Sequence, residues 1–245
     1  MKTVIQTDKL TKRFGDFIAA NEITLQVHQG EIFGFLGANG AGKTTAMRML
    51  CGLSTPTSGT AAIAGFDVYK ETEKIKRNIG YMSQKFSLYD DLTVMENIRF
   101  FGGIYGLSDQ ELKNKSQELV KRLDLEQESN KLVSSLPLGW KQKLSFSVAI
   151  LHNPAIVFLD EPTGGVDPLT RRQFWNLIYE AAERGLTIFV TTHYMDEAEY
   201  CNRISIMVDG KVEALDSPAN LKQSFGVNSM DDVFYQLARG AKRGD

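Results

Sequence analysis

The sequence predicts an α/β fold in which a parallel sheet is interrupted by a helical insertion, and three observations lead to this prediction. A short apolar run, Glu31–Leu36, ends in a glycine-rich loop that is followed by a helix-forming segment. Strand-like and helix-like segments alternate again from Ile156 onward. Between them, the stretch from about Thr93 to Leu151 has a helical pattern. Short apolar strands that alternate with helices are typical of a sheet covered by helices on both faces.

The composition is that of a soluble globular domain, and it narrows the possible partners. Of the 245 residues, 42% are hydrophobic and 24% are charged, which is ordinary for a folded domain. Lys and Arg total 28 and Asp and Glu total 30, so the net charge of −2 argues against a nucleic-acid partner, which usually requires a basic excess. Cys51 and Cys201 are the only cysteines, which predicts no disulfide framework and fits a reducing cytoplasm.

No segment of the sequence predicts membrane insertion. The first residues lack the apolar run of a signal peptide, and no stretch reaches the roughly 18 apolar residues that a spanning helix needs. We therefore expect any membrane crossing to be made by another chain.

The N-terminal part predicts several strands around one helix. Ile23, Leu25 and Val27 alternate with polar residues, which is the pattern of a half-buried strand. The apolar run that ends at Leu36 lacks this alternation and predicts a strand buried on both faces. A helix is expected from about Lys43. The strands predicted in this part are Val4–Leu10, Ile23–Val27, Glu31–Leu36, Gly59–Ala64 and Asn78–Met82.

Two capping boxes mark helix starts in the central stretch. Thr93 is followed three residues later by Glu96, and Ser108 by Glu111, so each pair can satisfy free backbone amides at a helix N-terminus. The second of these helices is charged on most sides and apolar on one. That apolar face carries Leu112, Leu119, Val120 and Leu123.

The C-terminal part predicts strands and helices in alternation. Ile156–Leu159 and Thr187–Thr191 are apolar runs of strand length. Between them, Asp167 and Pro168 predict a helix start, because Asp caps a helix and Pro fits its first position. Residues 239–245 are expected to form a flexible tail. The inner face of the predicted helix carries Phe174, Leu177, Ile178 and Ala181.

Residues 37–44 form a phosphate-binding motif, G-x-x-x-x-G-K-[ST], between a predicted strand and a predicted helix, which is the context that the motif requires. Its glycines let backbone N–H groups point at phosphate oxygens, and the helix N-terminus adds a positive dipole. Lys43 can reach the β- and γ-phosphates, Thr44 can ligate Mg²⁺, and Thr45 is expected to support the loop. The alternative is a chance glycine-rich turn. The nucleotide-binding residues predicted here are Gly37, Asn39, Gly40, Ala41, Gly42, Lys43, Thr44 and Thr45.

A second element of a phosphate site is an acidic pair at the end of a buried strand. The apolar run from Ile156 delivers Asp160 and Glu161 to the carboxyl edge of the predicted sheet, where ligands of parallel sheets bind. Asp160 suits the Mg²⁺ shell, and Glu161 suits activation of a water molecule. Alone, the pair could equally cap a helix. Beside a phosphate loop, the interpretation as a metal ligand and a catalytic base is favoured.

These two elements and the segments between and around them resemble the ATP-binding cassette (ABC) family of transporter ATPases over nearly the whole chain. Gln84, in Y-M-S-Q, resembles the family's Q-loop glutamine, which contacts Mg²⁺ and water and senses the permease. Asp167, in G-G-V-D, lies at the spacing of the D-loop. His193, in T-T-H, resembles the switch histidine that contacts the γ-phosphate. Phe14, in K-R-F-G, matches the aromatic residue that stacks on adenine.

Each of these residues also has a purely structural interpretation. A single glutamine is usually a solvated loop residue, a histidine at a strand end is usually structural, and Phe14 could belong to the core. Their order and spacing relative to the phosphate loop favour the functional interpretation.

One element departs from the family pattern. The family signature is Leu-Ser-Gly-Gly-Gln, which contacts the γ-phosphate bound by the opposite subunit, and the matching segment here is L-P-L-G-W, residues 136–140. Only Leu136 and Gly139 agree. Proline is tolerated at a first helical position, so Pro137 is expected to begin a helix whose N-terminus, with Gly139, still faces phosphate in trans. The contact made by the missing serine hydroxyl is expected to be lost.

The resemblance implies a fold and a function. The implied fold is a P-loop NTPase core of mostly parallel sheet, with an N-terminal antiparallel β subdomain and a helical insertion at about residues 90–152, all within one domain of residues 1–238. The implied function is to bind and hydrolyse ATP with Mg²⁺ as the ATP-binding subunit of an exporter. Two cassettes, expected to be a homodimer, would close around two ATP molecules and drive a permease on a separate chain, at the cytoplasmic face of the membrane.

The more specific expectations are these. Residues 192–199 and the terminal helix Met230–Leu237 resemble the multidrug and daunorubicin-resistance branch of exporters. Phe86, Leu88 and Tyr89 follow the Q-loop glutamine and line either a permease groove or the core of the insertion. The alternatives for the whole chain are a soluble ABC-type nucleotide-dependent switch acting on ribosomes or DNA, and a small-molecule P-loop kinase, although no arginine-rich lid is evident.

Overall fold

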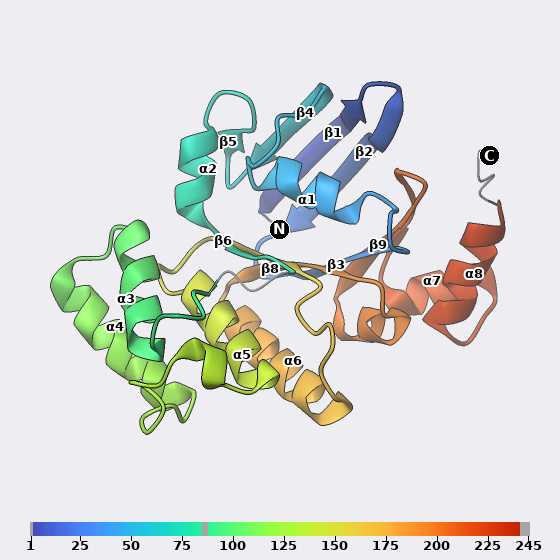
Figure 1. Ribbon diagram of the computed structural model, residues 1–245. Coiled ribbons are helices and arrows are strands. Elements are labelled where there is room, and N and C mark those ends of the chain that lie inside the picture. Colours follow the sequence, from blue (N-terminus) through green and yellow to red (C-terminus); the bar gives the residue numbers. More distant parts are fainter. Residues whose placement is uncertain (1, 85–87, 241–245) are drawn as a thin grey trace.

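The computed structural model describes residues 2–84 and 88–240, which form two sheets with helices between and around them (Figure 1). An antiparallel sheet comes from the N-terminal part. Its strands β1 (Thr3–Phe14) and β2 (Phe17–His28) form a hairpin, and β4 (Ser58–Ile63) and β5 (Phe66–Asp67) complete the order β2-β1-β4-β5. This sheet confirms the antiparallel β subdomain that the resemblance implied.

The second sheet contains the strands that end at the phosphate loop and the acidic pair. Its order is β10-β9-β3-β8-β7-β6, and its neighbouring strands are parallel except for β10, which runs antiparallel to β9. Because β3, β8 and β7 are adjacent and parallel, their carboxyl ends meet at one edge of the sheet. The strands are β3 (Ile32–Leu36), β6 (Ile79–Met82), β7 (Ile156–Asp160), β8 (Thr187–Thr192), β9 (Arg203–Val208) and β10 (Lys211–Asp216).

Side-chain alternation along these strands divides the core into two layers. Phe33 and Phe189 stack with their ring centroids 5.5 Å apart, and they pack with α1 (Lys43–Leu50) between the two sheets. Leu36 and Val157 belong to the opposite layer, against α6 (Pro168–Glu183). Figure 1 shows α1 above the central sheet and α5 and α6 below it. The remaining elements outside the insertion are α2 (Thr72–Asn78), the 3-10 helix η2 (Met195–Tyr200), α7 (Pro218–Phe225) and α8 (Met230–Gly240).

The central stretch forms a group of helices with its own hydrophobic cluster. It contains α3 (Val94–Ile104), α4 (Asp109–Arg122), the 3-10 helix η1 (Val133–Ser135) and α5 (Leu138–Ala149). Both predicted capping boxes are present, at Thr93 and Ser108. The cluster draws on every one of these elements. Its buried members include Val94, Ile98, Leu119, Val120, Val133, Leu144 and Val148.

The structure also corrects the sequence-based assignments. The notable omissions are β9 and β10, a hairpin on the edge of the central sheet. In addition, α8 continues through Gly240, so Arg239 is helical rather than part of a flexible tail; residues 241–245 lie outside the described residues. In the described part of the chain, none of the helices has the length and apolarity that a membrane span requires.

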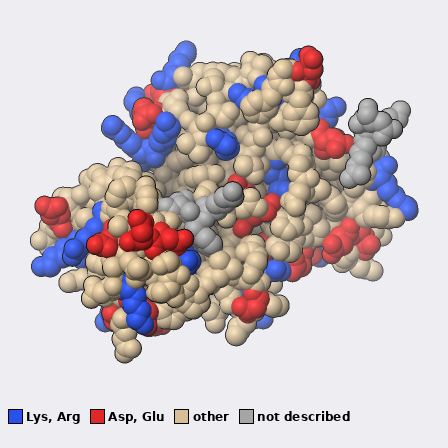
Figure 2. Space-filling model, in the orientation of Figure 1, with Lys and Arg blue, Asp and Glu red and all other residues tan. Residues whose placement is uncertain are grey.

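Charged side chains are mixed over the surface. On the face that Figure 2 shows, basic and acidic side chains lie interspersed across the described residues rather than gathered into one basic surface. Broad binding to a nucleic-acid backbone would favour a continuous basic patch.

Candidate functional site

The phosphate loop connects β3 to α1 at the carboxyl edge of the central sheet. Gly42 is the N-cap of α1 and has a φ of 99°, in the left-handed region that favours glycine. A Cβ atom at Gly42 would collide with the carbonyl oxygen of Ala19, on β2. The loop itself is closed by a hydrogen bond of 3.1 Å from the N–H of Ala41 to the oxygen of Ala38. Sequence spacing predicted this turn, and the tight approach to β2 explains why its last glycine is required.

The Lys43 side chain is buried among backbone carbonyls and one carboxylate. Its Nζ donates to the oxygens of Gly37 at 2.7 Å and Ala38 at 3.1 Å, and it lies 3.5 Å from Oε1 of Glu161. Burial lowers the pKa of Lys43, and the nearby Glu161 opposes the shift. A phosphate oxygen is a stronger, charge-assisted acceptor than a carbonyl, so a nucleotide can compete for this ammonium.

Asp160 is a buried carboxylate held by two hydroxyls. Its Oδ1 accepts a hydrogen bond of 2.6 Å from Thr191 and one of 3.4 Å from Thr44. Burial raises the pKa of Asp160, and the hydrogen bond from Thr191 opposes that shift. One carboxylate beside one hydroxyl, next to a phosphate loop, fits the way Mg²⁺ binds, through few protein oxygens together with phosphate oxygens and waters. Thr191 was not among the predicted residues, although it lies two positions before His193 on β8.

Glu161 is the point on which the other candidate residues converge. Its backbone has a positive φ of 48°, and its N–H donates to the backbone oxygen and to the hydroxyl of Thr191, at 3.1 Å each. The Glu161 Oε2 accepts from Nε2 of Gln84 at 2.9 Å, and Nδ1 of His193 lies 3.1 Å from it. The structure therefore brings together Lys43, Gln84 and His193 around one carboxylate, while their predicted contacts with phosphate and Mg²⁺ stay predictions.

A cavity of about 190 Å³ lies beside this carboxylate. Gln84 and Glu161 line it, together with Gln142 of α5 and the backbone of Gly164. This volume accommodates the water molecule that a catalytic base needs within hydrogen-bond reach. The amide of Gln84 points at Glu161, so its predicted role as a Mg²⁺ ligand stays a prediction.

Phe14 and the residues after Gln84 have different surroundings. The Phe14 side chain is 56% exposed at the end of β1, which contradicts the alternative that it belongs to the core; its stacking on adenine stays a prediction. Leu88 is buried in the cluster of the insertion, whereas Tyr89 is 46% exposed and packs edge-on against Phe100. Phe86 lies outside the described residues. Thr45 is half-buried in α1.

The signature segment, Leu136–Trp140, begins α5 differently from the prediction. The first helical residue is Leu138, and Pro137 is the N-cap rather than the first position of the helix. The N-cap carbonyl of Pro137 accepts hydrogen bonds from Trp140 at 3.0 Å and Lys141 at 3.1 Å. No side chain caps this helix, because proline has no side-chain acceptor.

The signature segment packs against the D-loop, Gly164–Asp167, of its own chain. A Cβ atom at Gly139 would collide with the side chain of Thr170, which explains the glycine there. Asp167 caps α6, as predicted, by accepting a 3.0 Å hydrogen bond from the N–H of Thr170. Nε2 of Gln142 donates to the oxygen of Gly164 at 3.3 Å, a link that sequence reasoning missed. The contacts of Gly139 and Asp167 with a second cassette stay predictions.

Residues 20–164 match the ABC transporter family. The chain belongs to this family. Its phosphate loop and acidic pair both lie within the matched range, and the fold and family predicted from the sequence are thereby confirmed.

Several curated ABC relatives are similar over most of this cassette. The probable multidrug ABC transporter ATP-binding protein YbhF of Escherichia coli is 46% identical over 241 residues, which is 96% of this chain and 42% of that protein. The human ATP-binding cassette sub-family A member 2 is 39% identical over 91% of this chain and 9% of its own length. The chain thus spans less than half the length of these relatives. The Nod factor export ATP-binding protein I of Cupriavidus pinatubonensis is 35% identical, over 91% of this chain and 69% of that protein.

Solved ABC cassettes share the whole architecture. An ATP-binding subunit of an ABC transporter superimposes with a TM-score of 0.86 and 28% identity, over 96% of this chain and 99% of that one. A dimeric ATP-binding cassette in a post-hydrolysis state, bound to ADP and Pi, gives a TM-score of 0.78 and 28% identity over 87% of this chain and 98% of that one. The cassette is therefore an ABC transporter ATPase domain by family and by fold.

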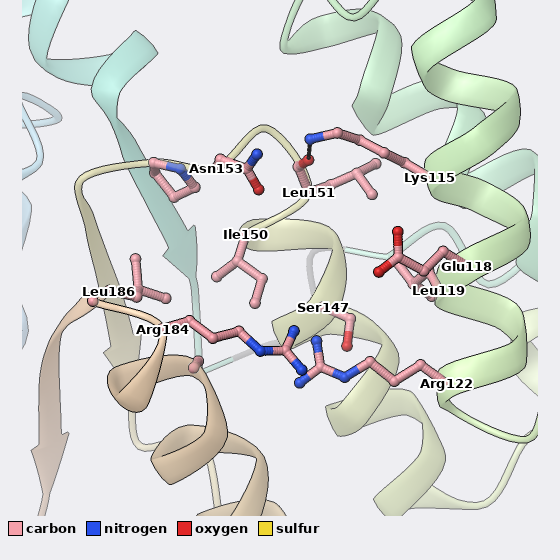
Figure 3. A pocket seen from close by; sticks show the side chains of 13 residues that line it. Lys115, Glu118, Leu119, Arg122, Ser147, Ile150, Leu151, Asn153, Arg184 and Leu186 are labelled. Atoms are coloured by element: carbon pink, nitrogen blue, oxygen red, sulfur yellow. Dashed lines mark hydrogen bonds between the residues drawn. The ribbon is translucent and has the colours of Figure 1, made fainter.

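A cavity of about 500 Å³ lies far from the phosphate loop, between α4 and the ends of α5 and α6 (Figure 3). Arg122 and Arg184 extend toward one another across it, and Lys115 donates a 2.6 Å hydrogen bond to the oxygen of Leu151. Both α5 and α6 end there, so their N-termini, which are the ends that favour anions, lie away from the cavity. The phosphate site is at the opposite edge of the sheet.

Proposed function

We propose that this ABC cassette is the ATP-hydrolysing subunit of an exporter and energises transport through a permease on a separate membrane chain. The observation that carries the proposal is the convergence of Gln84 and His193 on Glu161, next to Lys43 and the phosphate loop. An acidic pair that only capped a helix would not collect an amide, an imidazole and an ammonium around one carboxylate. The multidrug and export names of the relatives support the choice of an exporter.

The residues divide the hydrolysis step among themselves. Lys43 and the backbone amides of the loop bind the β- and γ-phosphates of ATP, and Phe14 stacks on adenine. Glu161 orients a water molecule and accepts its proton as the water oxygen attacks the γ-phosphorus, while the bond to the β-phosphate oxygen breaks and ADP leaves with its electrons. Gln84 and His193 hold Glu161 and the γ-phosphate in line. Asp160 and Thr44 would hold Mg²⁺, which supplies charge neutralisation on the phosphates.

The second half of the site is supplied by another cassette. The exposure of Asp167 in the D-loop and the lack of a side-chain cap on α5 support a role for Gly139 and Asp167 in contacting ATP bound by a partner cassette. We favour a homodimer, closed around two ATP molecules, that opens after hydrolysis. Among the solved relatives, a dimeric cassette bound to ADP and Pi supports this arrangement. In this proposal the permease holds the pair at the cytoplasmic face of the membrane.

Two measurements on the chain test this function. The first is phosphate release from Mg-ATP without an acceptor substrate, which a small-molecule kinase would not give. The second is co-purification from a detergent-solubilised membrane fraction with an integral membrane protein. ATP hydrolysis with the chain found only in the soluble fraction would instead support an ABC-type switch that is not coupled to transport.

A further inference from the structure

A buried carboxylate behind the catalytic edge joins segments that are distant in the sequence. Glu197, in η2, is fully buried. Its Oε1 accepts a 2.5 Å hydrogen bond from the hydroxyl of Thr163, which is 1% exposed. The Nε of Arg171, on α6, lies 3.5 Å from the same oxygen. We call these three residues the Glu197 cluster.

Each member of the Glu197 cluster follows a different functional residue along the chain. Thr163 comes shortly after the catalytic base, Arg171 lies one helical turn beyond the D-loop aspartate, and Glu197 lies in the 3-10 helix that follows the switch histidine. The cluster therefore fastens the segments after β7 and β8 and the start of α6 to one another. The three functional residues concerned are Glu161, Asp167 and His193.

Arg171 also reaches the histidine through an aromatic ring. The centre of its guanidinium lies 4.2 Å from the ring centroid of Tyr194, and the Tyr194 ring lies 4.2 Å from the imidazole of His193. A second carboxylate, that of Asp196, lies 3.3 Å from Nη1 of Arg171. An arginine that is stacked on a ring and paired with carboxylates is held in one orientation, which lysine cannot reproduce. The Tyr194 ring therefore lies in contact with both this guanidinium and the imidazole of His193.

We propose that Glu197, Arg171 and Thr163 are positioning residues for ATP hydrolysis, which together set the placement of Glu161 relative to His193. The proposal rests on the proposed function, since it concerns the geometry of that reaction. Burial supports it, because a charged pair removed from water requires good geometry to be retained. Two buried polar atoms of the pair, Nε of Arg171 and Oε2 of Glu197, have no hydrogen-bond partner among the described residues.

The first test separates positioning from stability. Arg171→Met is expected to lower kcat at least tenfold with little change in KM for ATP, because the phosphate loop is untouched. It is also expected to lower the melting temperature, since the Glu197 carboxylate is left buried without its cation. The double variant Arg171→Met/Glu197→Met removes both charges, so its melting temperature is expected to recover while kcat stays low. Thr163→Val is expected to lower kcat a few-fold, and Thr163→Ser to restore it.

Arg203 provides a matched control. Its Nη1 lies 3.1 Å from Oε1 of Glu31, another largely buried carboxylate, and its guanidinium lies 5.7 Å from the ring of Phe33. This pair is at the start of β9, at the opposite edge of the sheet from the phosphate loop. Arg203→Met is expected to lower the melting temperature and keep kcat. Equal losses of kcat in the Arg171 and Arg203 variants, or recovery of kcat in the double variant, would overturn the proposal.

A second test does not depend on hydrolysis. The chain has 3 histidines, so their Cε1–H signals can be assigned one by one in NMR spectra of the nucleotide-free protein. Arg171→Met is expected to shift the His193 signal. Arg203→Met is expected to shift that of His28 instead, because the backbone N–H of His28 donates to Oε2 of Glu31 at 2.7 Å. An unmoved His193 signal in Arg171→Met refutes the proposal. A wild-type chain without ATPase activity would count against the proposed function alone.

Discussion

The two halves of the proposed nucleotide site use charge in opposite ways. In the half built on β3 and β7, burial lowers the pKa of Lys43 and raises the pKa of Asp160, so folding places both groups where their charged forms are disfavoured. In the half at the start of α5 and α6, Asp167 is exposed, and hydrogen bonds from the side chain and backbone of Thr170 lower its pKa. The first half costs the folded chain stability, and the second half contributes to it.

This difference shows which half needs its ligand. The buried charges around Glu161 are compensated mainly by one another, and phosphate and Mg²⁺ would complete that compensation. The D-loop is already satisfied within its own chain, through the N-cap of α6 and the bond from Gln142 to Gly164, whereas the N-terminus of α5 has no side-chain cap. In the proposed dimer, the D-loop and the signature segment face a second cassette. Variants in the first half should therefore change chemistry and binding, and variants in the second half should change closure of the dimer.

The largest effect is expected for Glu161→Gln. The amide keeps the shape of the side chain and cannot accept a proton, so turnover should fall roughly 10²- to 10⁴-fold. ATP binding should persist, because Lys43 and the loop amides remain, and the variant should accumulate as a closed dimer. Phosphate release measures the turnover, and size-exclusion chromatography with ATP measures the closed dimer. A variant that stays monomeric with ATP would contradict the head-to-tail arrangement of two cassettes.

The next largest effect is expected for Lys43→Ala. A charge-assisted contact to phosphate contributes roughly 1.5–3 kcal/mol, so the Kd for ATP should rise roughly 10- to 150-fold. Isothermal titration calorimetry measures the change. Lys74→Ala is the control, since it removes an exposed lysine paired with Glu71 on α2 and should bind ATP normally. Unchanged affinity in Lys43→Ala would remove the phosphate loop from the site.

A smaller effect, in the opposite direction, is expected in the second half of the site. Pro137→Ser with Leu138→Gly restores the serine and the first glycine of the family signature and places a side-chain acceptor at the N-cap of α5, where proline offers none. The recovered hydroxyl contact to a charged phosphate is expected to tighten the ATP-bound dimer roughly tenfold to a hundredfold and to raise basal hydrolysis. The dependence of the ATPase rate on protein concentration, measured for both versions, reports dimer closure and basal hydrolysis. If both versions close at the same concentration, the segment does not contact nucleotide in trans.

The smallest effects are expected in the stability of the nucleotide-free chain, and they have opposite signs. The pKa of Asp160 is higher in the folded chain than its unfolded value of 3.8. Asp160 therefore does not destabilise the folded chain below pH 3.8, and it does so increasingly as pH rises through the folded pKa. At neutral pH, Asp160→Asn should raise the melting temperature while Mg-ATP turnover is lost. The folded pKa of Asp167 is lowered, so its contribution is present above 3.8 and is lost as pH falls through the folded pKa.

Asp167→Asn is the matched variant in the second half and should lower the melting temperature at neutral pH. Thermal unfolding of both variants between pH 3 and pH 7 gives the comparison directly. Two variants that shift the melting temperature in the same direction would contradict the distinction between the halves.

Much of the site could be predicted because its residues are close in sequence to elements with strong local patterns. The phosphate loop follows an apolar strand, Asp160 and Glu161 end another, and His193 follows a third. Parallel strands bring such positions to one edge whatever the rest of the chain does. The Glu197 cluster could not be predicted in this way. Its members follow no recognisable spacing pattern, and the sequence does not distinguish a buried glutamate from a solvated one.

The amino-acid sequence by itself determined the apolar strands β3, β7 and β8, the two capping boxes and the phosphate-binding turn, because these depend on interactions within a few residues. The tertiary structure decided which charges lose water and which partners they find. Gly42 cannot carry a Cβ atom because β2 passes beside it, and Gly139 is small because Thr170 packs against it. Pro137 precedes α5 instead of beginning it, because its ψ of 150° is extended rather than helical. Contacts and desolvation of this kind arise between elements that are far apart in the chain, so no local pattern encodes them.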